Sequence, residues 1–270
     1  CGMGGSALAA LLSLSWPGYK VPFEVCRNYN IPFYVGEKTL VIVASYSGNT
    51  EETLEALAQA EQKGAKIAVI AGGGKLAEAA QSKGYPLASL PKAAQPRYAV
   101  LYNLKAILDL IGPTGLLNND NVESELSSSA EFLKQATVAW LPTVAADQNP
   151  AKKLAMELAG KSPVIYAGPL MAPAAYKWKI SFNENAKNIA WRGEYPEFNH
   201  NEFIGWSSHP IDKPYAIIDL RSNLEHPRIH KRMELSDRLL SGMRPAANVV
   251  EAQGQTLLEQ LLWTVAFGDF

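Results

Sequence analysis

Residues 39–60 read TLVIVASYSGNTEETLEALAQA, and this stretch predicts the fold of the first half of the chain. The β-branched run at 39–43 is typical of a buried strand, and 54–60 has the composition of a helix that Gly64 ends. A turn rich in hydroxyl groups joins the two. Because free N–H groups and the positive end of the helix dipole face such a turn, it can hold an anion.

The hydroxyl groups of this turn are the first candidate functional groups. Ser45, Ser47 and Thr50 can each donate a hydrogen bond to a phosphate oxygen. The alternative is an ordinary helix start beside a polar turn, since Thr50 and Thr53 are common capping residues. The turn by itself is compatible with both interpretations.

The composition of the 270 residues is that of an ordinary globular protein. Hydrophobic residues make up 47% and charged residues 19%, which argues against disorder. The length is enough for one large or two medium domains. A net charge of −1 argues against a general binder of nucleic acid or anionic membranes, so an anionic ligand must be met by a local site.

The cysteines and histidines indicate no structural cross-link. Cys1 and Cys26 are too few for a disulfide framework, and with four histidines they give no metal-binding pattern. This cysteine usage suits a reducing cytoplasm. No apolar run reaches about 18 residues, so we expect no membrane span.

A glycine-rich segment at residues 2–7 (GMGGSA) precedes an apolar helix candidate at 8–12. Gly4 and Gly5 allow a ligand to approach the backbone closely, and Ser6 stands where the helix would begin. A flexible glycine-rich terminus is the alternative.

Strands and helices alternate through residue 111. Residues 66–71 predict a buried strand, and GGGK at 72–75 is interpreted as a plain strand-to-helix loop because it lacks the spacing of a P-loop. The other elements expected here are a short strand and loop within 21–33, a helix at 76–80, a weak strand at 87–90 and a helix from 95 to 111. Such alternation predicts an open, doubly wound parallel sheet, whose ligands bind at the carboxyl ends of the strands.

Arg97 is an unusually placed cation, because it lies one residue after a proline at a predicted helix start. The helix dipole disfavours positive charge at that end, so a nearby anion would explain the arginine. A chance surface position is the alternative.

The second half of the chain begins after a break rich in Gly, Pro and Asn at 112–121. The domains expected are 1–121 and 151–270, with 122–150 as a bridging helix, at 122–144, and a linker. The elements expected in the second α/β domain are strands at 163–168, 215–219 and 248–250, and helices at 150–160, 173–188, 227–240 and from 255.

A dense polar stretch runs from residue 183 to residue 206. Glu184 lies on a predicted helix one turn before Lys187, so a surface ion pair is the alternative to a functional role. His200, between two asparagines, would titrate near neutrality and shuttle a proton, or else be a hydrogen-bonded structural histidine. A basic run at 226–232 is interpreted as a solvated helix face, with an anion contact or a subunit interface as alternatives.

Four motifs occur together in this chain: GMGGSA at 2–7, SYSGNTEET at 45–53, NENAK at 183–187 and PEFNHNE at 196–202. In this order they resemble the bifunctional phosphoglucose/phosphomannose isomerases, members of the sugar isomerase (SIS) domain superfamily. The serine-rich turn by itself indicates an SIS domain, and the last two motifs narrow the resemblance to this family. The likeness covers most of the chain.

The resemblance implies an α/β fold of two tandem SIS domains, each a doubly wound parallel sheet flanked by helices. It also implies a cytoplasmic homodimer that interconverts glucose 6-phosphate or mannose 6-phosphate with fructose 6-phosphate through an enediolate, without a metal or a cofactor. A sugar 6-phosphate is the expected partner, with no nucleic acid and no membrane.

The resemblance also assigns roles to single residues. It implies a phosphate site made of Gly4, Gly5, Ser6, Ser45, Ser47 and Thr50. Glu184 would be the base that moves a proton between C1 and C2, and Arg97 would stabilise the enediolate. His200 would assist ring opening in the active site of the neighbouring subunit.

Two other functions stay open. One is a non-catalytic SIS protein that senses a sugar phosphate and regulates a partner; it would not need Glu184, Arg97 and His200 together, so their co-occurrence disfavours it. The other is a different SIS enzyme, such as an amino-sugar phosphate isomerase. Family members also carry an earlier first strand and a C-terminal lysine that joins in ring opening, and we assign that role to neither Lys153 nor Lys231.

Overall fold

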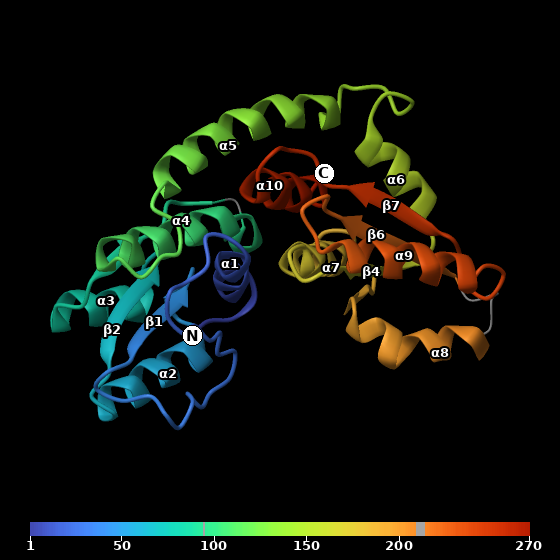
Figure 1. Cartoon of the computed structure of the whole chain (residues 1–270). Helices are drawn as coiled ribbons and strands as arrows, with labels where there is room; N and C mark the ends of the chain where they lie inside the picture. The colour runs from blue at the N-terminus through green and yellow to red at the C-terminus, as the bar shows by residue number, and fades with distance from the viewer. Residues whose placement is uncertain (94, 209–213) are drawn as a thin grey trace. The chain divides into compact units, whose positions relative to one another are not determined.

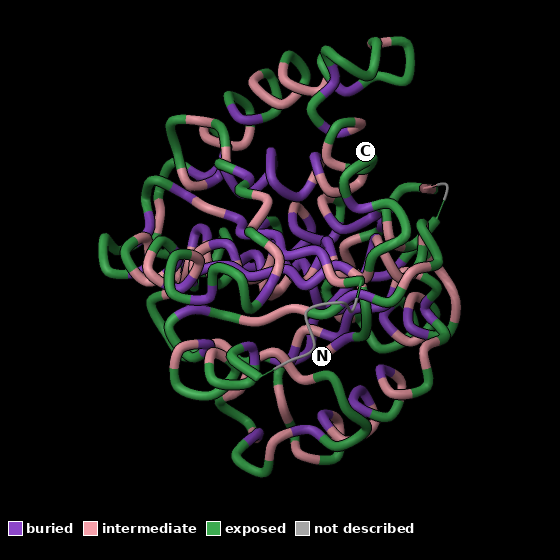
Figure 2. Tube along the Cα trace, turned by 90° about the vertical axis from the view of Figure 1, so that its right-hand side faces the viewer, coloured by how far each residue is buried: buried purple, intermediate pink, exposed green. Residues whose placement is uncertain are grey.

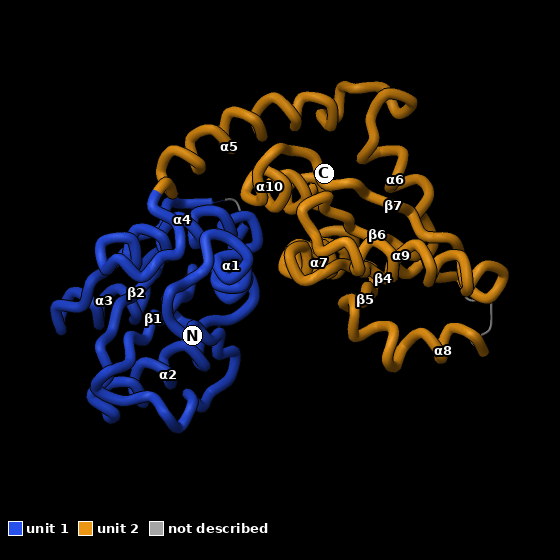
Figure 3. The backbone as a smooth tube through the Cα atoms, viewed as in Figure 1, with its two compact units in different colours: residues 1–120 blue, residues 121–270 orange. Residues whose placement is uncertain are grey.

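The computed structural model describes residues 1–93, 95–208 and 214–270. The chain divides into two compact units, residues 1–120 (unit 1) and residues 121–270 (unit 2), which are coloured separately in Figure 3. Each unit is built on its own parallel β-sheet flanked by helices (Figure 1). The predicted α/β class with two parallel sheets is confirmed, whereas the predicted boundaries of a separate bridging segment stay a prediction.

The described residues of unit 1 form a three-stranded parallel sheet in the order β1-β2-β3. The strands are β1 (Leu40–Ser45), β2 (Lys66–Ala71) and β3 (Leu87–Ser89). Apolar side chains fill β1 and β2 almost continuously, because helices cover both faces of the sheet. The carboxyl ends of these strands therefore form a common edge.

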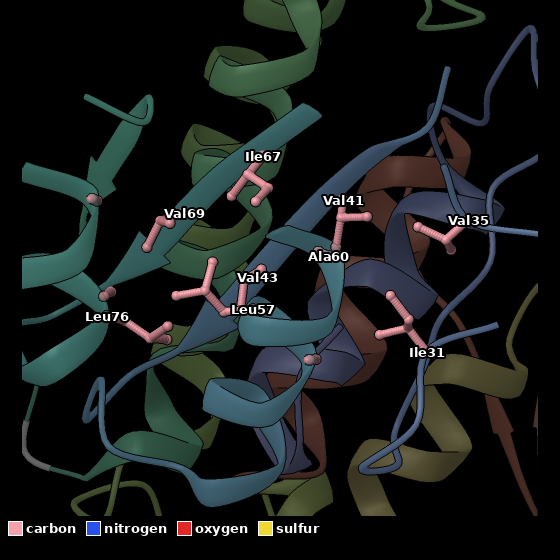
Figure 4. Close-up of a cluster of buried hydrophobic side chains, with 12 residues drawn as sticks. Ile31, Val35, Val41, Val43, Leu57, Ala60, Ile67, Val69 and Leu76 are labelled. Atoms are coloured by element: carbon pink, nitrogen blue, oxygen red, sulfur yellow. The ribbon is translucent and has the colours of Figure 1, made fainter. Parts of the chain in front are cut away.

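Two pairs of helices cover the sheet of unit 1. They are α1 (Gly4–Ser15), α2 (Glu51–Gln62), α3 (Gly74–Lys83) and α4 (Val100–Ile111). α2 and α3 connect successive strands and pack on one face, while α1 and α4 pack against each other and contact the strands from the other side. In the core beneath α2 and α3, Leu57 and Leu76 meet Val43 and Val69 (Figure 4). Burial of each such side chain contributes about 1.5–3 kcal/mol to stability.

The described residues of unit 2 form a four-stranded parallel sheet in the order β5-β4-β6-β7. The strands are β4 (Ser162–Ala167), β5 (Trp191–Glu194), β6 (Tyr215–Arg221) and β7 (Ala247–Glu251). The chain leaves β4 toward β5 on one side, and β6 and β7 follow on the other side. The strand order therefore reverses between β4 and β6, which is the topological switch point of an open α/β sheet.

The helices of unit 2 are α5 (Val122–Ala136), α6 (Pro150–Leu158), α7 (Ala172–Glu184), α8 (Glu202–Ser208), α9 (Pro227–Leu239) and α10 (Leu257–Phe267). α7 packs against α10, where the indole Nε1 of Trp178 donates to the carbonyl of Thr264 at 2.7 Å. Side chains of α8 and α9 pack on the other face of the sheet, around Tyr166 and Ile217. Buried residues are purple in Figure 2, and in unit 2 they include five of the six residues of β4 and five of the seven residues of β6.

Several local predictions for unit 1 are wrong in detail. Residues 21–33, all of them described, form no strand, because prolines interrupt the segment. The helix predicted from residue 95 begins only at Val100, after the 3-10 turn η1 (Pro96–Tyr98) that carries Arg97.

Unit 2 also differs in detail from the prediction. The helix predicted for 122–144 ends at Ala136 and continues as the 3-10 turn η3 (Thr137–Trp140), and the helix predicted for 173–188 ends at Glu184. Strand β5 was not predicted, because its four residues are only partly buried and contain no apolar run. Among the described residues, no helix is long and apolar enough to cross a membrane.

Candidate functional site

The turn between β1 and α2 gathers the hydroxyl groups of three side chains at the carboxyl edge of the unit 1 sheet. Ser45 Oγ lies 2.7 Å from Thr50 Oγ1 and 3.4 Å from Ser47 Oγ. Ser45 Oγ also accepts a hydrogen bond from the backbone N–H of Gly48 at 3.2 Å. Thr50 precedes α2, but its side chain accepts no capping hydrogen bond from the described residues of that helix. Thr50 thus occupies the N-cap position, as the alternative predicts, but its hydroxyl faces Ser45 instead of capping the helix.

The loop after β2 supports this turn, and the two loops touch through glycines. Gly48 has a φ of +69°, and a Cβ there would lie 1.7 Å from the carbonyl oxygen of Gly73. Gly72 donates to the carbonyl of Tyr46 at 3.0 Å, and Asn49 Oδ1 accepts from the N–H of Lys75 at 3.2 Å. The GGGK segment is thus the strand-to-helix loop predicted for it, and its glycines let the two loops approach closely.

The glycine-rich segment lies at the same edge. Gly2 forms a parallel bridge with Ala44 of β1, and α1 begins two residues later at Gly4, which has a φ of +51°. Ser6, in the first turn of α1, is buried. The segment is therefore ordered, and the interpretation as a flexible terminus is wrong.

Arg97 lies beside this helix start. A Cβ added to Gly5 would lie 3.4 Å from the carbonyl oxygen of Pro96 and 3.8 Å from Cα of Arg97, so the backbone of η1 packs directly on α1. The guanidinium of Arg97 is half-buried and lies over the ring of Tyr98, 5.5 Å from its centroid. The structure thus places Gly4, Gly5, Ser6, the 45–50 turn and Arg97 at one end of unit 1.

Glu184 is the last residue of α7 and is exposed. Because α7 runs antiparallel to β4, its end lies at the amino edge of the sheet, where Asn188 Nδ2 donates to the carbonyl of Lys161 at 2.7 Å. Lys187 has a φ of +55°, and its Nζ donates to the backbone carbonyl of Glu184 at 2.5 Å. This contact holds the backbone at the end of the helix.

His200 ends the 3-10 turn η4 (Glu197–His200) and is exposed. In the described part of the chain, no hydrogen bond to its imidazole ring is found, so the structural alternative has no support. The neighbouring Asn199 anchors the turn instead: its Nδ2 donates to Ser236 Oγ at 2.8 Å, and its Oδ1 accepts from Arg232 at 3.2 Å.

Glu184 and His200 are carried on opposite faces of the unit 2 sheet. α7 packs with α10 on one face, whereas η4 is fixed to α9 on the other face through Asn199 and the buried Phe198. Strands β4 and β6 lie between the two layers. The structure therefore does not bring these two predicted catalytic residues of one chain together within unit 2.

The structure also reveals a buried carboxylate that no sequence pattern singles out. Glu225 is 7% exposed, and its Oε1 accepts from the N–H of Leu170 at 2.7 Å, directly before α7. A Cβ on Gly168 would lie 2.4 Å from the same oxygen. Burial raises the pKa of this carboxyl, and the backbone N–H groups of the turn lower it. A carboxylate of the chain itself thus lies at the loop that leads into α7.

Two family models match this chain. One, described as the bacterial phospho-glucose isomerase C-terminal SIS domain, matches residues 147–270, and the other, described as the SIS domain, matches residues 28–95. Among solved structures, a glucose-6-phosphate isomerase like protein from Thermus thermophilus superposes with a TM-score of 0.64 at 20% identity, covering 100% of this chain and 78% of that one. At this identity the match shows the fold.

Sequence relatives cover most or all of the chain. The bifunctional phosphoglucose/phosphomannose isomerase of Caldicellulosiruptor bescii is 35% identical over 273 residues, which cover 100% of this chain and 80% of that protein. The D-glucosamine-6-phosphate 4-epimerase of Sulfolobus acidocaldarius is 37% identical over 222 residues, which cover 77% of this chain and 63% of that protein. By full-length similarity, the chain belongs to the bifunctional phosphoglucose/phosphomannose isomerase family.

Proposed function

We propose that this protein is an aldose–ketose isomerase that interconverts glucose 6-phosphate or mannose 6-phosphate with fructose 6-phosphate. The single observation that carries the proposal is the cluster of hydroxyl groups at Ser45, Ser47 and Thr50, at the start of α2, in a chain of this family. A dianionic phosphate accepts hydrogen bonds from such hydroxyls and from the free N–H groups of the helix. Ser6 and the backbone of Gly4 and Gly5 complete this phosphate site.

The proton transfer is assigned to side chains outside the phosphate site. Glu184 removes the proton from C2 of the aldose and returns it to C1 through an enediolate, in which the C2 stereochemistry is lost. Arg97 stabilises the negative oxygen of that intermediate. The loss of stereochemistry is what lets one site accept both C2 epimers.

We assign His200 to ring opening in the active site of a neighbouring subunit of a cytoplasmic homodimer. The position of His200 on the opposite face of the sheet from α7 supports this assignment, because the sheet separates it from Glu184 of the same chain. Mixing provides a test. Glu184→Gln and His200→Ala chains, each inactive alone, should regain activity when they exchange subunits, and a mixture that stays inactive contradicts the assignment.

A coupled assay tests the activity itself. The wild-type chain should form fructose 6-phosphate from glucose 6-phosphate and from mannose 6-phosphate. Glu184→Gln should lower kcat by at least about a hundredfold, the usual contribution of a general base, with little change in sugar phosphate affinity. A wild-type chain that binds the substrates without turnover would instead be a sensor, and turnover retained in Glu184→Gln would contradict the base.

The epimerase relative gives a second candidate function, since its identity of 37% is as high as that of the isomerase. An epimerase would use the same phosphate site with an amino sugar. Incubation with D-glucosamine 6-phosphate followed by proton NMR separates the two. We expect the spectrum to stay that of the substrate, and a new C4 epimer would favour the epimerase.

A further inference from the structure

The side chain of Tyr46 connects the turn at residues 45–50 (the phosphate turn) with the segment that precedes Arg97. Tyr46 stands between Ser45 and Ser47, and its hydroxyl accepts a hydrogen bond from the backbone N–H of Ala93 at 2.6 Å. The same hydroxyl can donate its single proton to either of two carbonyl oxygens, that of Pro91 at 3.3 Å or that of Ala93 at 3.5 Å. One side chain of the phosphate turn thus binds the backbone of a segment 47 residues later.

The residues bound by Tyr46, Pro91 and Ala93, lie shortly before Arg97 in the chain. They follow β3, where Leu90 N–H donates to the carbonyl of Ala71 at 3.0 Å, and they precede η1. In η1, the backbone of Arg97 packs on Gly5. The described residues before and after position 94 are therefore held at three points, namely the end of β2, the Tyr46 hydroxyl and the start of α1.

We propose that Tyr46 is a positioning residue, which holds Arg97 where the enediolate oxygen forms. The proposal rests on the function proposed above for Arg97. Ser45 and Ser47 flank Tyr46 and belong to the phosphate site, so a bound phosphate fixes the backbone from which the tyrosine extends. The backbone carbonyl of Tyr46 is itself held by Gly72 N–H at 3.0 Å. Displacing a charged group by about 1 Å is enough to lower a rate by about a hundredfold, so this support matters for catalysis.

Tyr46→Phe is the variant that tests the proposal, because it removes only the hydroxyl. The expected result is a kcat lowered about tenfold to a hundredfold, with KM within about twofold, since the phosphate site keeps its own groups. The matched control is Tyr85→Phe, which removes the hydroxyl that bonds Glu61 Oε1 at 3.1 Å in the same unit. The control should retain the wild-type kcat, and thermal unfolding of both variants measures any loss of stability.

A binding experiment adds a measurement that needs no turnover. 5-Phospho-D-arabinonate carries a carboxylate in place of the charged enediolate, so its affinity reports on Arg97, whereas inorganic phosphate reports on the phosphate site alone. Calorimetric titration should show that Tyr46→Phe and Arg97→Ala each weaken the arabinonate about tenfold, while phosphate affinity stays within about twofold. The double variant, which combines Tyr46→Phe with Arg97→Ala, should bind 5-phospho-D-arabinonate no more weakly than Arg97→Ala does, because Tyr46 acts through Arg97.

Two outcomes would overturn the proposal separately from the function. The role of Tyr46 would be contradicted if Tyr46→Phe kept the wild-type kcat and the wild-type affinity for 5-phospho-D-arabinonate. It would also be contradicted if the losses of affinity caused by the two substitutions added up in the double variant. A wild-type chain without isomerase activity would instead contradict the proposed function, and with it the role of Arg97 that the positioning requires.

Discussion

The side-chain oxygens of Ser45 and Thr50 lie 2.7 Å apart, so the last residue of β1 is joined to the residue before α2. Thr50→Val removes one of these hydroxyls at nearly constant volume. Because hydrogen bonds to charged groups contribute about 1.5–3 kcal/mol, we expect the affinity for fructose 6-phosphate to fall about tenfold to a hundredfold. The free energy of unfolding should fall by no more than about 0.5–1.5 kcal/mol, because the Thr50 hydroxyl bonds Ser45 and does not cap α2. Ser82→Ala, which removes a hydroxyl at an exposed position of α3, is the control, and equal affinities in both variants would exclude Thr50 from the site.

Gly48→Ala should destabilise unit 1 and abolish phosphate binding. Its φ of +69° is strained for alanine, and the added Cβ would overlap the carbonyl oxygen of Gly73. We expect a loss of more than about 3 kcal/mol in the free energy of unfolding, measured with urea. Gly36→Ala is the control, since a Cβ there meets no atom within 4 Å. A Gly48 variant as stable as this control would show that the two loops can separate without cost.

Asp219 should make stability fall as the pH rises through the range from about 4 to about 6. Burial raises the pKa of this carboxyl to about 6, although Arg244 and Arg221 lower it. The folded state therefore keeps a proton that the unfolded state releases near the ordinary aspartate pKa of 3.8. Ionisation of Asp219 in the folded state lowers the free energy of unfolding by on the order of 3 kcal/mol. This loss of stability is fully present above pH 6 and disappears as the pH falls toward 4.

Urea unfolding of Asp219→Asn at a series of pH values checks this effect. The variant should have a flatter stability profile between about pH 4 and pH 6 than the wild-type chain, because asparagine does not titrate. Asp147→Asn, at an exposed position, should keep the wild-type slope. An unchanged slope in Asp219→Asn would assign the pH dependence to other groups.

Lys177→Met should destabilise unit 2. The Lys177 ammonium is buried on α7, where it is paired with Asp269 and donates to Ser181 Oγ at 2.6 Å. Removing one partner leaves the other charge without its ion pair in a largely buried site, which costs about 3–5 kcal/mol in the free energy of unfolding. Lys153→Met, at an exposed position on α6, is the matched control. Equal stability of the two variants, measured by urea unfolding, would show that Asp269 is sufficiently solvated alone.

The sequence predicted best those features that are local. The apolar runs of β1 and β2 and the hydroxyl groups between Ser45 and Thr50 are contiguous in the chain, so their structure follows from composition and spacing. The fold class followed from the alternation of such strands with helices. β5 escaped prediction because it is a short, partly buried strand whose position depends on pairing with β4.

Contacts between distant residues could not be predicted in this way. Tyr46 meets Ala93 across 47 residues, and Glu225 meets Leu170 across 55, with no pattern in the sequence that joins either pair. The separation of Glu184 and His200 on two faces follows from the reversal of strand order beside β4, which no single motif encodes. Motifs therefore identify candidate groups, and the topology decides which of them can meet.

The buried carboxylate of Glu225 has a consequence for how ligand binding is coupled to stability. Unit 2 carries its own negative charge at the start of α7, so that helix is neutralised with or without substrate. In unit 1 the phosphate site proposed above would receive its negative charge from the sugar phosphate. Binding of inorganic phosphate should therefore saturate at one ion per chain, and the stabilisation that grows with phosphate concentration should belong to unit 1.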